Sequence, residues 1–73
     1  MKKKIQLKIP SALVNEPIIY KMVTLYEVVP NILEAKLNPH STGEVKLELN
    51  GSLDNIEKGI LYLKELNIDV TEM

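Results

Sequence analysis

A central stretch decides the fold, and it reads NILEAKLNPHSTGEVKLELN, residues 31–50. Apolar and polar residues alternate on both sides of a turn-rich middle, NPHSTG, at residues 38–43. The alternation assigns Leu33, Ala35 and Leu37 to one face of a strand, Ile32, Glu34 and Lys36 to its other face, and Val45, Leu47 and Leu49 to one face of the next strand. Two alternating runs joined by a short loop predict an antiparallel hairpin.

A strand and a helix are predicted before this hairpin. Residues 4–9 alternate strictly between polar and apolar side chains, which is the pattern of a half-buried strand. Asn15 or Glu16 is expected to cap a helix that carries Pro17 in its first turn, and Pro30 is expected to stop it. The apolar stripe predicted for this helix consists of Ile19, Met22, Val23 and Tyr26.

A second helix and a short strand are predicted after the hairpin. Ser52 is a favourable N-cap, Asp54 follows in the first turn, and Asn67 suits the left-handed conformation that often ends a helix. Gly59 lies in mid-helix, where close packing of the helix is the expected reason for it. Residues 68–71 alternate again and predict the last strand. The buried stripe predicted for this helix consists of Leu53, Ile56, Ile60 and Leu63.

The predicted order is therefore βαββαβ, an α+β fold. Each strand has only one apolar face, so both helices must cover the same face of a four-stranded antiparallel sheet, which gives the ferredoxin-like sandwich. The chain contains no linker or repeat, and residues 1–73 are expected to form a single domain.

The other face of the sheet is expected to be polar and balanced in charge. In this topology the first strand lies between the third and the fourth, which places Lys4 and Lys8 between Glu44 and Glu48 on one side and Asp69 on the other. Opposite charges across neighbouring strands attract one another. A solvated face is the simpler interpretation, and a binding platform is the alternative.

Composition excludes several classes of function. The chain has ten acidic residues, nine Lys, no Arg and a formal net charge of −1, which argues against nucleic-acid binding. It has no Cys, so disulfides, thiolate nucleophiles and iron–sulfur ligands are excluded. The predicted strands carry no aromatic residue on which an RNA base could stack. No apolar run is long enough for membrane insertion, and the cytoplasm is the expected compartment.

Catalytic chemistry is not indicated by any constellation of residues. His40 is the only histidine and falls in the predicted hairpin loop. Together with Glu44 it could form at most a weak metal site, because two ligands on a loop are poor evidence. We therefore expect a protein that is not an enzyme and that carries no cofactor and no metal.

The motif Asn31-Ile32-Leu33 resembles the one for which the NIL domain family is named. Other segments of the chain agree with this family in order and spacing, from the lysine-flanked first strand to the last one. They include EPIIY at residues 16–20, LNGS at residues 49–52 and YLKE at residues 62–65. The resemblance covers nearly the whole chain.

The resemblance implies a ferredoxin-like fold and a regulatory role. Members of the family occur at the C-terminus of methionine-importer ATPases of the ABC transporter type, where the domain pairs as a homodimer and binds methionine to inhibit transport. Other members are joined to 4Fe-4S ferredoxin modules. The partners that follow are an amino-acid ligand, a second copy of the chain, and an ABC transporter ATPase or a ferredoxin.

Two residues of the motif are candidates for the ligand site. The amide of Asn31 offers both a donor and an acceptor, which suits the carboxylate and the ammonium of an amino acid. The alternative is that Asn31 satisfies backbone groups beside Pro30. Ile32 faces away from the core in the predicted alternation, as an interface residue or as an ordinary exposed side chain. The primary hypothesis is a non-enzymatic domain that binds an amino acid such as methionine. The alternative is an accessory domain of a ferredoxin or redox enzyme, without a small ligand.

Overall fold

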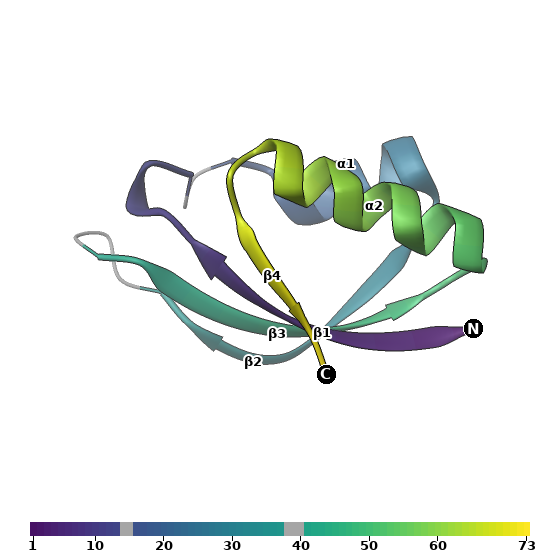
Figure 1. Ribbon diagram of the computed structural model, residues 1–73, viewed down its shortest axis with the longest axis horizontal. Coiled ribbons are helices and arrows are strands. Elements are labelled where there is room, and N and C mark those ends of the chain that lie inside the picture. Colours follow the sequence, from purple (N-terminus) through teal and green to yellow (C-terminus); the bar gives the residue numbers. More distant parts are fainter. Residues whose placement is uncertain (14–15, 38–40) are drawn as a thin grey trace.

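The computed structural model of the chain describes residues 1–13, 16–37 and 41–73. Its elements are β1 (Lys2–Ile9), the 3-10 helix η1 (Ser11–Leu13), α1 (Ile18–Tyr26), β2 (Val29–Lys36), β3 (Gly43–Asn50), α2 (Leu53–Glu65) and β4 (Asp69–Glu72). The strands form one antiparallel sheet in the order β2-β3-β1-β4, and both helices lie on the same side of it (Figure 1). The predicted α+β, ferredoxin-like βαββαβ arrangement is confirmed.

The core forms between the two central strands and the two helices. Alternate residues of β1 and β3 point toward the helices and are buried, as their sequence pattern predicts. The buried apolar side chains are Ile5, Leu7, Ile9, Ile18, Met22, Val28, Val45, Leu47, Leu49, Ile56, Ile60, Leu63 and Ile68. Because no Cys is present to cross-link the chain, this packing is the main source of its stability.

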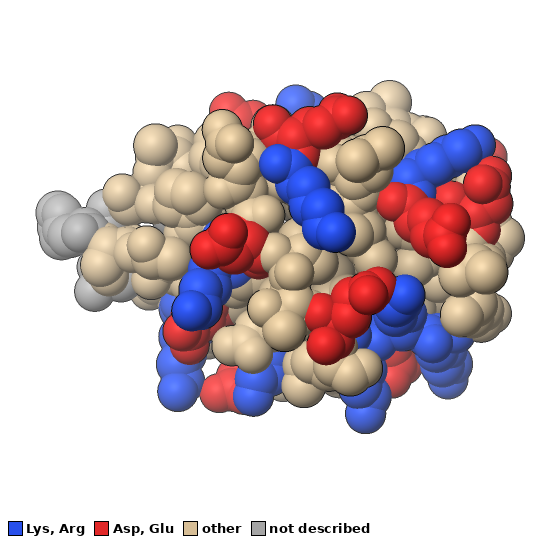
Figure 2. Space-filling model, in the orientation of Figure 1, with Lys and Arg blue, Asp and Glu red and all other residues tan. Residues whose placement is uncertain are grey.

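The open face of the sheet carries the charge pattern expected from the sequence. Lys4 lies opposite Glu48, and Lys8 lies between Glu44 on β3 and Asp69 on β4. Figure 2 shows Lys and acidic side chains intermixed along the lower edge of the molecule, where the sheet lies in Figure 1. This alternation of sign leaves no broad positive surface in that view.

The ends of α2 follow the predicted capping signals. The Asn55 backbone N–H donates to the Ser52 side-chain oxygen at 3.1 Å, and Asn67 adopts a left-handed conformation with a φ of 64°. The prediction that Leu53 belongs to the buried stripe is wrong. Its side chain is 47% exposed, because it is the first residue of the helix and extends past the edge of the core.

Replacing the cap of α2 tests this local contribution. We expect Ser52→Ala to lower the free energy of unfolding by about 1 kcal/mol, because the Asn55 N–H loses its acceptor. Ser52→Gly is the matched control and should lose only about a few tenths of a kcal/mol, since glycine is well accepted at an N-cap. Urea denaturation measures both. Equal stability of Ser52→Ala and the unmodified chain would contradict the assignment.

The start and the end of α1 differ from the prediction. The helix begins at Ile18, with Pro17 in the cap position and no capping hydrogen bond from a side chain, while Asn15 lies outside the described residues. It ends at Tyr26, because Glu27 turns left-handed with a φ of 55°. Pro30 therefore does not stop the helix; it lies within β2.

The face that α1 buries is also rotated from the predicted one. Ile18 and Met22 are buried, whereas Val23, predicted to be in the stripe, is 44% exposed. Ile19 and Tyr26 are half-buried against the core, as expected. The predicted apolar stripe therefore includes Val23, which is exposed, and omits Ile18, which is buried.

Gly59 lies in the contact between the two helices, as predicted, although a methyl group at this position would make only ordinary van der Waals contacts. A methyl group built on its Cα would lie 3.4 Å from the Met22 Cε of α1 and 3.7 Å from a methyl of Val28. Farther along the same contact, the rings of Tyr26 and Tyr62 lie 5.3 Å apart. A large side chain at position 59 would separate the two helices.

Neither helix within the described ranges could serve as a membrane span, since none combines the required length with sufficient apolarity.

Candidate functional site

A β-bulge in β2 changes the orientation of the motif residues. Ile32 lies opposite Leu47 of β3, but the next pair is Glu34 with Lys46, so Leu33 is an extra residue. A bulge places two residues of one strand opposite one of its partner and shifts the alternation after it. The prediction that Ile32 faces away from the core is therefore wrong, because Leu47 points into the core and Ile32 shares its face.

Asn31 lies on the other face of the sheet. It is paired with Glu48, which itself lies opposite Lys4 on the open face. The two candidate ligand residues are thus adjacent in sequence but point to opposite sides of β2. A small ligand on one face can contact only one of the two side chains.

The helix side of β2 is only partly covered, and the lengths of the elements explain why. α1 has nine residues and is about 13 Å long, whereas β2 and β3 have eight residues each and extend over about 26 Å. One end of the sheet therefore projects beyond the helix. In consequence Ile32 and Leu37 are 55% and 54% exposed although they lie on the apolar face.

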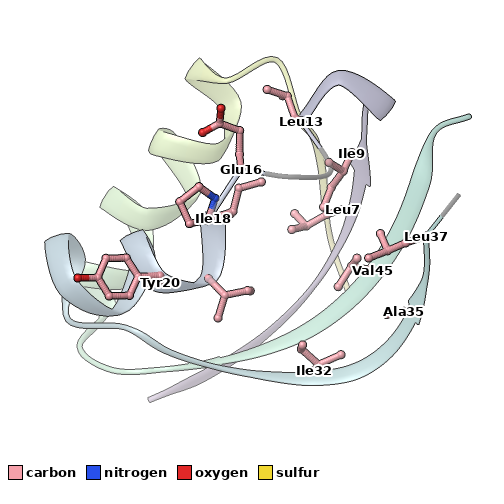
Figure 3. Close-up of a pocket in the computed structure, with 12 residues that line it drawn as sticks. Leu7, Ile9, Leu13, Glu16, Ile18, Tyr20, Ile32, Ala35, Leu37 and Val45 are labelled. Atoms are coloured by element: carbon pink, nitrogen blue, oxygen red, sulfur yellow. The ribbon is translucent and has the colours of Figure 1, made fainter. Parts of the chain in front are cut away.

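An apolar pocket of ≈ 210 Å³ occupies the space that α1 leaves open. Figure 3 shows Ile32 and Val45 pointing from the sheet into this hollow, with Leu7 and Ile9 beside them and the start of α1 forming the opposite wall. The described lining residues are Leu7, Ile9, Leu13, Glu16, Pro17, Ile18, Ile19, Tyr20, Ile32, Ala35, Leu37 and Val45. Such a surface offers an apolar group a place out of water.

A pair of opposite charges lies near the start of α1, and one of its two members lines the pocket. Glu16 is the charged residue among the described side chains that line it, and the Lys21 ammonium lies 3.8 Å from the Glu16 carboxylate. Both side chains are more than a third exposed, so each can exchange its partner for a ligand. Glu16 can therefore meet an ammonium at the pocket, while Lys21, which is not among the described lining residues, lies next to Glu16.

Most of this pocket was not identified from the sequence. Of the predicted site residues it contains Ile32 and not Asn31. The sequence indicates Glu16 only as one of two possible helix caps, and Ile18 only as part of the segment EPIIY. The spacing of Glu16 before an apolar helix start is a weak signal, and nothing in the sequence gives the extent to which a helix covers a sheet.

A second cluster of polar side chains lies on the open face of β2. The Glu34 carboxylate is 3.3 Å from the Lys46 ammonium and 3.7 Å from that of Lys36. Hydrogen bonding and attraction from Lys46, with a smaller contribution from Lys36, hold the pKa of Glu34 below its ordinary value. Glu72 behaves in the same way beside Lys3, whose hydrogen bond lowers the pKa of that carboxyl.

The lowered pKa of Glu34 predicts a pH dependence of stability. A carboxyl with a lower pKa in the folded chain stabilises the fold above its unfolded pKa, and that contribution is lost as the pH falls through the folded value. We therefore expect the unfolding free energy of Glu34→Gln to fall less steeply than that of the unmodified chain below about pH 4.5.

Denaturation at a series of pH values measures the difference. In a Lys46→Met background, which removes the main partner of Glu34, the effect of Glu34→Gln should shrink. Identical pH profiles for the unmodified chain and for Glu34→Gln would count against the interaction.

No candidate metal centre is found among the described residues, where no three His, Cys, Asp or Glu side chains gather around one point. The weak site considered for His40 with Glu44 lies outside this description, because His40 is not among the described residues.

Comparison with known proteins assigns the chain to a family and supports its fold. The family model described as NIL domain matches residues 3–72. Uncharacterized protein ssr2439 of Synechocystis sp. (strain ATCC 27184 / PCC 6803 / Kazusa) is 34% identical over 65 residues, which are 88% of this chain and 67% of that protein. The C-terminal domain of an ABC transporter ATP-binding protein from Enterococcus faecalis has the same fold, with a TM-score of 0.82 at 23% identity, over 97% of this chain and 82% of that one.

Proposed function

Since the chain belongs to the NIL domain family, we propose that it is a non-enzymatic regulatory domain that binds an apolar amino acid and acts as a homodimer in the cytoplasm. Methionine is the first ligand to test. The ligand's side chain enters the pocket beside Ile32, its ammonium meets Glu16, and its carboxylate meets Lys21.

The observation that carries this proposal is an apolar pocket that has Glu16 in its lining and Lys21 next to Glu16. An amino acid has one apolar part and two opposite charges, and the described residues offer a counterpart for each. Small-ligand sites are typically apolar cavities with a few polar groups that fix orientation. The pocket thus fits the general pattern of such sites.

The size of the pocket limits the ligand. Its ≈ 210 Å³ is below the roughly 300–1,000 Å³ of pockets that bind drug-sized molecules. A ligand with a side chain of a few heavy atoms fits this space, whereas a nucleotide does not. An unbranched, flexible side chain such as that of methionine adapts well to an irregular apolar surface.

Asn31 belongs to a competing version of the site. Because its side chain lies on the open face with Glu48, it would contact a ligand bound there and not one in the pocket. We propose the pocket as the site because the open face near Asn31 is polar and charged. Variants of Asn31 and Ile32 distinguish the two versions of the site.

The proposed partner of the domain is the ATPase of an ABC transporter, in which ligand binding would regulate transport. The support is the shared fold with the C-terminal domain of an ABC transporter ATP-binding protein, together with membership of the family. The alternative, an accessory domain of a ferredoxin or redox enzyme, predicts that no amino acid binds.

Calorimetry with methionine, leucine and glycine tests the proposal. We expect heat of binding for methionine, and weaker or no binding for glycine, which lacks an apolar side chain. Full burial of a methionine side chain is worth about 1.5–3 kcal/mol, which corresponds to about tenfold to a hundredfold in affinity. A thermal shift by methionine and not by glycine should accompany the heat.

Absence of both heat and thermal shift at millimolar methionine would reject methionine as the ligand, and equal binding of methionine and glycine would reject the pocket. Neither result depends on the oligomeric state, which is measured separately.

A further inference from the structure

β2 is an edge strand with an unusually apolar surface. Its paired neighbour among the described strands is β3 alone, so its other edge presents backbone groups to solvent. Around that edge Ile32, Leu33 and Leu37 are 55%, 46% and 54% exposed. An exposed edge with apolar side chains is a template for pairing with another strand.

The sheet register shows which backbone groups of β2 face the free edge. The Gly51 N–H donates to the Met1 carbonyl at 3.0 Å, which makes this pair a hydrogen-bonded pair of the β1–β3 ladder. Hydrogen-bonded pairs alternate along an antiparallel ladder, so Leu49, Leu47 and Val45 bond to β1, while Glu48, Lys46 and Glu44 bond to β2.

It follows that the β2 residues opposite Glu48, Lys46 and Glu44 use their backbone groups within the sheet. The backbone groups of Ile32 and Ala35, which lie between them, point outward from the edge. Pro30 also faces this edge, where its missing N–H costs no hydrogen bond within the sheet.

We propose that two copies of the chain pair through β2 in antiparallel orientation, with the two-fold axis at Ala35. The inference rests on the proposed homodimer and specifies its surface and register. Ala35 of one copy then exchanges backbone hydrogen bonds with Ala35 of the other, and the two sheets join into one of eight strands.

The side chains on both sides of Ala35 are complementary in this register. Glu34 of each copy lies opposite Lys36 of the other copy, so two pairs of opposite charges face each other across the two β2 strands. Leu33 lies opposite Leu37 of the second copy, which covers two of the exposed apolar residues. Ala35 is small enough to allow the two backbones to approach at the axis.

Registers with the axis at Glu34, Lys36 or Leu33 lack this complementarity. An axis at Glu34 places two carboxylates opposite each other, and an axis at Lys36 does the same with two ammonium groups. Like charges directly opposite in a sheet are unfavourable. An axis at Leu33 would place Ala35 opposite Asn31 of the second copy. The backbone groups of Ala35 point outward, whereas those of Asn31 point into their own sheet, so the two residues could not exchange hydrogen bonds.

Disulfide cross-linking of single-Cys variants tests the register, and the absence of native Cys makes the readout clean. Opposed residues of a hydrogen-bonded pair have Cα atoms about 5.5 Å apart, within the range of a disulfide. Ala35→Cys should therefore form a covalent dimer under mild oxidation. Leu33→Cys and Leu37→Cys should not cross-link alone, but a mixture of the two should form the mixed dimer.

Charge exchange provides an independent measurement by sedimentation. Glu34→Lys should raise the dimer dissociation constant about tenfold, because it faces Lys36 of the other copy. The exchange variant Glu34→Lys with Lys36→Glu restores the facing opposite charges and should recover most of the affinity. Circular dichroism confirms that each variant is folded.

Several outcomes would overturn the inference. Efficient cross-linking of Leu33→Cys alone, or no recovery in the exchange variant, rejects the register while leaving a dimer intact. A chain that sediments as a monomer at high micromolar concentration rejects the pairing itself. Leu37 belongs to both the proposed interface and the pocket wall, so calorimetry is carried out on the same preparations. Heat of methionine binding to a chain that sediments as a monomer separates failure of the pairing from failure of the proposed ligand.

Discussion

Leu47→Ala is expected to lower the free energy of unfolding by about 2–5 kcal/mol. Leu47 is fully buried in the central strand β3, where its side chain packs beneath the helices. Truncation removes the transfer free energy of the lost methyl groups and leaves a cavity that the surrounding core fills only in part. For a chain of 73 residues the total stability is about 4–11 kcal/mol, so this single change removes a large fraction of it.

Urea denaturation at one protein concentration measures the loss, since association of the chain makes stability depend on concentration. With a slope of about 1 kcal/mol per molar urea, the midpoint should fall by about 2 M or more. Leu61→Ala on α2 is the matched control. Its side chain is 56% exposed, and a change within about 0.5 kcal/mol is expected. A shift of similar size in both variants would show that burial does not determine the effect.

The overall fold could be predicted from the sequence because its signals are local and agree with one another. Strict alternation identified β1 and β3, and Ser52 with Asn67 marked the two ends of α2. The order of the elements then left few arrangements in which one apolar face is buried. The opposition of Lys8 to Glu44 and Asp69 followed from that topology without further information.

The orientation of β2 after the bulge was predicted correctly for Glu34, Ala35 and Lys36, but that of Ile32 was not, because the pattern there is compatible with two interpretations. Ile32 and Leu33 are both apolar, so either of them can take the inner face. The bulge decides between them, and a bulge depends on how β2 pairs with β3 and not on the residues of β2 alone. The extra residue Leu33 interrupts the alternation, so Ile32 and Ala35 share one face although an odd number of positions separates them.

The pocket could not be predicted for a different reason. Alternation tells which face of a strand is apolar, but it does not tell whether a helix covers that face along its whole length. Coverage depends on the start of α1 at Ile18, which follows the predicted cap, Asn15 or Glu16, by two to three residues. The late start shortens the helix and leaves Ile32 and Leu37 at an open pocket.

Asn31 and Ile32 are neighbours in the motif and point to opposite faces of β2. Ile32→Asp is expected to weaken the binding of methionine at least tenfold, because it places a carboxylate on the wall of an apolar pocket. The unpaired charge would lose its water when the ligand's side chain enters, which is unfavourable. The fold should tolerate the change, since Ile32 is 55% exposed and lies on an edge strand.

Asn31→Ala is the matched variant at the neighbouring position on the opposite face, and it should leave the affinity nearly unchanged. Calorimetry of both variants with methionine, together with a thermal melt of each without ligand, separates binding from folding. Loss of binding in Asn31→Ala with normal binding in Ile32→Asp would move the site to the open face of the sheet, beside Glu48. The two residues point in opposite directions from one strand, so a single ligand that depends equally on both side chains would require a site built from two copies of the chain.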